Sequence, residues 1–147
     1  YQSPRAVIAE TTINCLLGED LVTTEGNQTR EFNFVGNLID GFVLAAESAE
    51  AIGNIINLGC GHEVSIRDLV LKIHSSTHSS SRLRIGELDT RAGEIWRMFA
   101  DIAVAIKLLV WDPKVSLDVG RKVTAEWYRR YLEEFAQPNS ALAQLGM

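Results

Sequence analysis

The sequence lacks several features that would assign it to a specialised class of protein. Its only two cysteines, Cys15 and Cys60, lie far apart and in no metal-binding spacing, so we expect free buried thiols. No apolar run approaches the roughly 20 residues that a membrane-spanning helix needs, and no signal segment opens the chain. The net charge of -5 argues against a general nucleic-acid-binding protein. We therefore expect a cytoplasmic protein without nucleic-acid or membrane partners.

What the sequence does contain is ordinary for a globular protein. The length of 147 residues suggests one domain, and 46% hydrophobic with 22% charged residues is a typical composition. The chain opens at Tyr1 without an initiator methionine, so we expect it to be part of something longer.

Short strands and helices are predicted to alternate along the chain. Apolar spacing and capping signals, such as the capping box of residues 65–68, predict five helices, at 6–17, 35–47, 66–73, 102–109 and 116–135. β-Branched and apolar runs predict four strands, at 21–24, 30–34, 54–58 and 83–85. This order predicts an α/β (α+β-like) fold, a small mixed domain over residues 1–135. A loosely ordered tail is expected at 136–147.

Two predicted helices carry an apolar face at helical spacing. In the helix at 35–47 this stripe consists of Leu38, Ile39, Phe42, Val43 and Ala46. In the last helix, side chains recur every four residues and are expected to form its buried edge: Val119, Val123, Trp127 and Tyr131. The run 54–58 lies between two glycines and is predicted to be a buried strand.

Two patterns invite a ligand-binding interpretation but favour a plainer one. The turn Gly59-Cys60-Gly61 is the start of a dinucleotide-binding G-x-G-x-x-G fingerprint, but the third glycine would fall at Val64. A tight strand-to-helix turn is the favoured interpretation. His74 and His78 are four residues apart, which suits a metal on one helix face, but serines surround them. A solvated helix end followed by a polar loop is favoured there.

Two arginines form the strongest candidate site. Alternation along a strand places Arg30 on the same face as Phe32 and Phe34, and Arg91 sits in a turn beside a glycine. A buried guanidinium is costly unless a partner accepts its protons. That partner is either an internal carboxylate, for instance Glu25, Glu87 or Asp89, or an anionic ligand on which both arginines converge, for which phosphate is the best fit.

The order of four sequence blocks resembles the NAD-dependent epimerase/dehydratase family. The blocks are LVTTEGNQTREFNFVGNLIDGF, IINLGCGHEVSIRDLV, RIGELDTRAGEIWRMFAD and LVWDPKVSLDVGRKVTAEWY. They are similar to the C-terminal half of these extended short-chain dehydrogenases, which act on nucleotide sugars. The resemblance implies the substrate domain of such an enzyme, an isomerase (epimerase) or a related dehydratase or decarboxylase, seen without its Rossmann half.

The resemblance also assigns roles to particular residues. In the family, the arginines of the Q-T-R-D/E-F and R-x-G-D/E blocks bind the pyrophosphate of a UDP- or dTDP-linked sugar. They match Arg30 and Arg91, with Glu94 as the acidic member. The strand before the first block contacts the base through its main chain; here this strand is Val22, Thr23 and Thr24. Asn37 stands where the family usually has aspartate, and Ala92 where it usually has proline.

The family's chemistry depends on parts that this sequence does not contain. We find neither the glycine-rich NAD loop nor the Tyr-x-x-x-Lys pair. The chain is therefore expected to hold the nucleotide sugar, to bind no cofactor itself, and to have no catalytic residue of its own, with NAD bound elsewhere in the intact enzyme. Its expected partner is the missing Rossmann domain or a second copy. The alternative is a free-standing, non-catalytic module that binds nucleotide sugars or self-associates.

Overall fold

The computed structural model describes residue 3 and residues 5–135, and the predicted tail at 136–147 lies outside this range. Within it the fold is a mixed α/β arrangement, as predicted. Five α-helices are present: α1 (Val7–Leu17), α2 (Val35–Glu47), α3 (Ile66–Thr77), α4 (Ala103–Leu109) and α5 (Leu117–Phe135). The strands are short: β1 (Leu21–Thr23), β2 (Thr29–Glu31), β3 (Glu63–Ser65), β4 (Leu83–Ile85) and β5 (Arg97–Met98). A 3₁₀ turn, η1, covers Ala49–Ala51.

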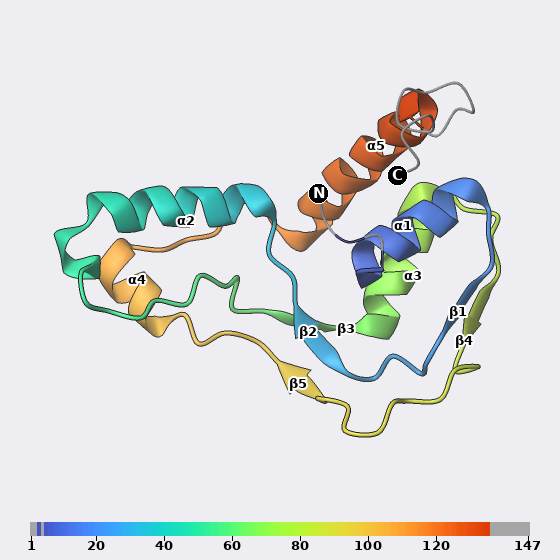
Figure 1. The fold of residues 1–147 in the computed structure, drawn as a ribbon, viewed down its shortest axis with the longest axis horizontal. Helices are drawn as coiled ribbons and strands as arrows, with labels where there is room; N and C mark the ends of the chain where they lie inside the picture. The colour runs from blue at the N-terminus through green and yellow to red at the C-terminus, as the bar shows by residue number, and fades with distance from the viewer. Residues whose placement is uncertain (1–2, 4, 136–147) are drawn as a thin grey trace.

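The strands form two small sheets. β1 and β4 pair in parallel, with Leu21 opposite Leu83. In the second sheet β2 is central, antiparallel to β3 and parallel to β5. Figure 1 shows α1 and α3 with β1 and β4 at one end, α2 and α4 at the other, and the three-stranded sheet between them.

Local signals explain where several elements begin and end. α1 ends at Gly18, whose φ of 71 is in the left-handed region that favours glycine. α3 begins at the predicted capping box, where the Ser65 hydroxyl accepts the Asp68 N–H at 3.0 Å. The carboxylate of Asp101 accepts the Ala103 N–H at 2.9 Å at the start of α4.

Two separate hydrophobic cores hold these elements together. The α1/α3 core consists of the buried residues Cys15, Leu69 and Ile73, with partly buried neighbours that include Phe32 and Val64. The α2/α4 core consists of Ala105, Leu109 and Trp111, with neighbours that include Ala45 and Leu58. Gly41 lets α2 approach this second core, because a Cβ there would lie 2.8 Å from Leu58 and 2.9 Å from Trp111.

Two predicted strands differ from the structure. β2 ends at Glu31, and Phe34 is already the N-cap of α2, so strand alternation does not continue from Arg30 to Phe34. Residues 54–58 form no strand, because none of the described strands pairs with them. The side chain of Ile55 is 92% exposed, so the prediction of a buried strand is wrong in this structure.

The predicted apolar faces exist, but parts of them face outward. On α2, the exposed members include Ile39, Phe42 and Val43. On α5, the predicted buried edge is also wrong: Val119, Val123 and Trp127 are exposed, whereas Ala125 and Tyr128 are buried. None of the helices in the described residues is long and apolar enough to cross a membrane.

Candidate functional site

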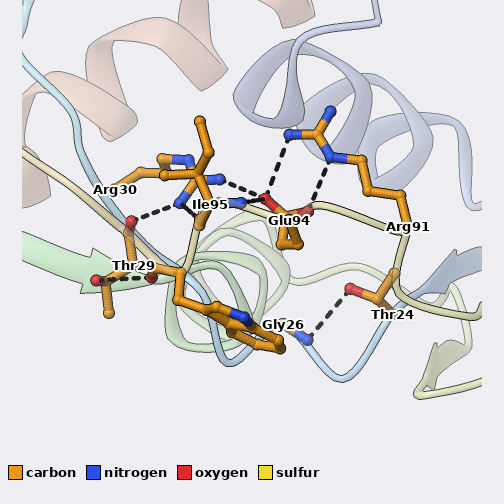
Figure 2. A network of polar contacts seen from close by, with 8 residues as sticks. Thr24, Gly26, Thr29, Arg30, Arg91, Glu94 and Ile95 are labelled. Carbon is orange, nitrogen blue, oxygen red and sulfur yellow. Dashed lines mark hydrogen bonds and ion pairs between the residues drawn. The ribbon is translucent and has the colours of Figure 1, made fainter.

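The two candidate arginines converge on one carboxylate, that of Glu94. Arg30 is on the central strand β2, whereas Arg91 and Glu94 belong to the loop between β4 and β5. The Nη2 of Arg30 lies 2.7 Å from Glu94 Oε1, and the Nε of Arg91 lies 3.1 Å from Glu94 Oε2. Figure 2 shows both guanidinium groups turned toward this carboxylate. The structure therefore brings together three residues that are up to 64 positions apart in sequence.

The sequence offered an internal carboxylate as one possible partner of the arginines, and the structure has one. The carboxylates suggested from the sequence were different ones. Glu25 pairs with Arg67, and Glu87 pairs with Arg84. Glu94 instead serves both candidate arginines. This sharing leaves the pair of cations with one internal negative charge between them.

The two arginines differ sharply in their surroundings. The side chain of Arg30 is 15% exposed, and its Nη1 donates to the carbonyl oxygens of Thr29 at 2.7 Å and Ile95 at 2.6 Å. The side chain of Arg91 is 70% exposed and hydrogen-bonds only to Glu94 among the described residues. Arg30 is thus held within the protein, whereas Arg91 faces solvent.

Glu94 is held on three sides. Its Oε1 accepts hydrogen bonds from Arg30, from Arg91 Nη2 at 3.2 Å and from the N–H of Ile95 at 3.0 Å. Burial acts most strongly on this carboxyl and by itself raises its pKa, but the hydrogen bonds and charges of Arg91 and Arg30 together lower the pKa below its ordinary value. Glu94 is therefore ionised at neutral pH.

The third predicted element of the site is the strand at residues 22–24. Val22 and Thr23 lie in β1, and Thr24 follows it. The Thr23 carbonyl accepts the N–H groups of Gly86 and Leu88, so it is already engaged with the β4 side. Thr24 accepts the Gly26 N–H through its hydroxyl at 3.3 Å, and Figure 2 draws this turn in the same view as Arg91.

A large cavity of about 700 Å³ lies elsewhere, between α1, the start of α2 and α5. Its lining is mainly apolar and aromatic and includes Phe32, Phe34, Trp127 and Tyr128. Arg30 is not among the lining residues, so this cavity does not bring Arg30 together with Phe32 and Phe34, which the sequence places on the same face of a strand. β2 ends at Glu31, before both aromatic residues, so the alternation of a strand no longer relates them to Arg30.

The Gly59-Cys60-Gly61 turn does not fit a dinucleotide. The N–H groups of Cys60 and Gly61 both donate to Glu31 Oε1 at 2.6 Å, and α3 begins only after β3 has intervened. Burial is the main cause that raises the pKa of the Cys60 thiol, and the nearby Glu31 carboxylate raises it further. Both cysteines are free, and Cys60 is only half-buried.

The histidines also have structural roles. His74 Nε2 lies 2.9 Å from the carbonyl oxygen of Ser81, and His78 is the left-handed C-cap of α3. In the part of the chain that the structure describes, no three His, Cys, Asp or Glu side chains form a group that could hold a metal ion.

Two polar residues, Asn37 and Glu31, have contacts to which the sequence assigned no role. Asn37 is almost fully buried: its amide donates to Val115 O and accepts from Val115 N, both at 2.9 Å. This reciprocal pair explains why an amide suits this position, because an ionised carboxylate has no donor. The second is Glu31, whose carboxylate accepts backbone N–H groups of Cys60, Gly61 and Ala100. In the sequence, only its place as the acidic residue after Arg30 could have pointed to it.

Comparisons with known proteins agree with the family resemblance found in the sequence. No protein-family model matches the chain. Over 119 residues it is 33% identical to a UDP-N-acetyl-alpha-D-glucosaminuronate decarboxylase of Bacillus cytotoxicus, which covers 78% of this chain and 37% of that protein. Over 131 residues it is 33% identical to UDP-glucuronic acid decarboxylase 1 of Danio rerio, covering 88% and 30% respectively.

Solved structures give the same result. A UDP-glucuronic acid 4-epimerase of Bacillus cereus, solved with UDP-glucuronic acid and NAD, matches with a TM-score of 0.78 and 28% identity, over 88% of this chain and 41% of that one. An epimerase of Methanothermobacter thermautotrophicus matches with a TM-score of 0.80 and 27% identity, over 89% and 39%.

The two decarboxylases and the Bacillus cereus epimerase are, by name, enzymes of nucleotide sugars. The chain is homologous to part of the NAD-dependent epimerase/dehydratase family, the extended short-chain dehydrogenases, which confirms the resemblance found in the sequence. It spans less than half the length of the relatives that it matches.

Proposed function

We propose that this chain is the nucleotide-sugar-binding portion of an NAD-dependent epimerase, decarboxylase or dehydratase, and that it is not catalytic alone. The relatives named above support the substrate class. The observation that carries the proposal is the meeting of Arg30 and Arg91 at Glu94. Two guanidinium groups around one carboxylate are an arrangement suited to a diphosphate, which presents several oxygens to both.

Arg91 is proposed to make the first contact with the ligand. Its guanidinium is mostly exposed, so phosphate oxygens can reach it without a change in the backbone. Arg30 is enclosed, so a phosphate contacts it only when Glu94 moves aside or when the ligand approaches a nitrogen that Glu94 leaves uncovered. Glu94 is thus the internal anion whose place the diphosphate shares.

The base is proposed to lie along β1. Val22 and Thr23 pair with β4 on one edge, and no described strand pairs with their other edge. The carbonyl oxygens of Thr23 and Thr24 already accept hydrogen bonds within the protein, so the main-chain groups of Val22 are proposed to meet the uracil or thymine. The NAD cofactor is proposed to bind to another part of the intact enzyme, since the glycine turn at residues 59–61 is filled by Glu31.

A second candidate function is association through an apolar surface, and the exposed face of α2 favours it. Ile39 is 55% exposed and Phe42 is 66% exposed, and Ile52, which lines a surface hollow together with Phe42, is exposed as well. Contiguous apolar surface of this kind commonly marks a protein–protein contact. The proposed partner is the Rossmann domain of the intact enzyme or a second copy of this chain.

Calorimetric titration of the 147-residue chain with UDP tests the proposed function. Each charged hydrogen bond to phosphate contributes about 1.5–3 kcal/mol, so Arg91→Ala and Arg30→Ala should each weaken UDP binding roughly tenfold or more. Arg129→Ala is the matched control, because Arg129 forms a similar ion pair with Glu126, three residues away on α5 and outside the site. Equal affinities of wild type and both site variants would contradict the proposal.

A further inference from the structure

The carboxylate of Glu31 is bound as an external anion would be. Its Oε1 accepts the N–H groups of Cys60 and Gly61, each at 2.6 Å, and its Oε2 accepts the N–H of Ala100 at 2.9 Å. Consecutive N–H groups that converge in this way form an anion-binding concavity. Gly61, with a φ of 72, supplies the left-handed backbone that such a turn requires.

The turn at residues 59–61 approaches this carboxylate closely on one side. A Cβ on Gly59 would lie 2.6 and 2.7 Å from the two oxygens of Glu31, so glycine is required there. The carbonyl of Gly59 in turn accepts the indole N–H of Trp111 at 2.7 Å within the α2/α4 core. The turn is therefore fixed from both sides, and Glu31 ties β2 to it.

Glu31 is also tied to the strand that leads out of the arginine cluster. Arg30 lies opposite Met98 of β5, and Ala100 follows Met98 by two residues. Glu94 and Ile95, which hold the Arg30 guanidinium, lie just before β5. β5 has only two residues, so its ladder alone gives little control of register. The bond from Ala100 to Glu31 supplies a second point of attachment.

We propose that Glu31 is the positioning residue of the arginine cluster: it holds the segment through β5 at a fixed register beside β2, and so places Glu94 and Ile95 around Arg30. This inference rests on the proposed function for its ligand, although the geometry belongs to the protein itself. Both oxygens of its carboxylate accept backbone N–H groups, so the role assigned to Glu31 is exerted through the backbone.

The positioning role and simple electrostatics predict opposite changes in UDP affinity when the charge of Glu31 is removed. Removing a negative charge near an anion site should strengthen anion binding or leave it unchanged. If Glu31 positions the cluster, Glu31→Gln should instead weaken UDP binding roughly fivefold or more, because a loosened site no longer presents its groups together. Glu63 is unsuitable as a control, because its carboxylate pairs with Arg97 of β5. The control is Glu126→Gln, which removes the same charge on α5, where Glu126 pairs with Arg129 and Arg130 of the same helix, and it should leave UDP binding unchanged.

Two further measurements keep the proposal testable if Glu31→Gln folds poorly or if UDP does not bind. Gly59→Ala retains all charges but displaces the carboxylate, and it should reproduce the loss of UDP affinity. Amide hydrogen exchange, read by NMR without ligand, should speed up about tenfold at Cys60, Gly61, Ala100 and Ile95 in Glu31→Gln when these bonds are lost.

The outcomes separate this inference from the proposed function. Weaker UDP binding in both variants, together with faster exchange, supports the positioning role. Unchanged or tighter UDP binding in Glu31→Gln and Gly59→Ala, or unchanged exchange at the four amides, overturns it. If the wild-type chain does not bind UDP, the proposed function fails, and the exchange experiment alone decides whether Glu31 holds the segment in register.

Discussion

The α1/α3 core and the α2/α4 core differ in how they are covered. Both centre on buried apolar residues, but the first is enclosed by two helices, strands and the start of α5. In the second, α2 packs on α4 with one side only, and Phe42 on its opposite side is 66% exposed. Apolar residues at helical spacing therefore predict an apolar face on a helix. They do not predict that this face is covered by other residues of the same chain.

Truncating a side chain in the α1/α3 core should lower the free energy of unfolding more than truncating one on the exposed face of α2. Leu69 is fully buried, so Leu69→Ala is expected to lower the free energy of unfolding by about 2–5 kcal/mol, through lost transfer energy and a cavity. Phe42→Ala on α2 should change it by no more than about 0.5 kcal/mol. Urea denaturation followed by circular dichroism measures both. Equal losses in the two variants would show that the contrast between the cores is wrong.

The α2/α4 core should depend on one hydrogen bond as well as on packing. Trp111→Phe removes the indole N–H that donates to the buried carbonyl of Gly59, and an unpaired buried acceptor costs about 1–3 kcal/mol. Trp96→Phe is the control, since Trp96 is mostly exposed and its change should stay within about 0.5 kcal/mol. Urea midpoints are again the measurement, and an undiminished midpoint in Trp111→Phe would contradict the assigned role.

Acid should lower the stabilisation that comes from the Arg30–Glu94–Arg91 cluster, whereas the apolar cores contain no such carboxylate. We expect this effect on the free energy of unfolding to be the smallest of the three. The folded pKa of Glu94 is lowered, so the unfolded chain binds more protons at low pH than the folded chain does. The stabilisation from Glu94 should be complete above the ordinary glutamate pKa of about 4.3. It should be lost as the pH falls further through the lowered value. Urea midpoints of wild type and Glu94→Gln between neutral and acid pH should converge on acidification; a constant difference would refute the shift.

Local signals in the sequence predicted the fold class and most helices. The capping box at Ser65 and the C-terminal glycine at Gly18 act within a few residues, and both were found as expected. β3 and β5 were missed, because two- and three-residue strands carry no period of their own and exist only through pairing with β2. The run 54–58 was misassigned for the converse reason: it has the composition of a strand but no partner among the described residues.

The sequence selected three residues that meet in the structure, but it did not predict their contacts, and their role in ligand binding stays a prediction. Arg30, Arg91 and Glu94 were selected from their blocks, and they do meet. The sequence could not show that one carboxylate serves both arginines, because that depends on the register of β5 against β2. The role of Glu31 was hidden for the same reason, since its three N–H partners come from two distant segments.

The sharing of Glu94 has a consequence for selectivity. Any anion that approaches Arg91 meets an intramolecular competitor, tethered three residues away, whose effective concentration is high. A singly charged anion with one point of contact gains little by displacing it. A ligand with several linked negative oxygens can engage Arg91 while Glu94 remains on Arg30. Under the proposed function we therefore expect the arrangement to discriminate by the number of charges a ligand carries rather than by its size.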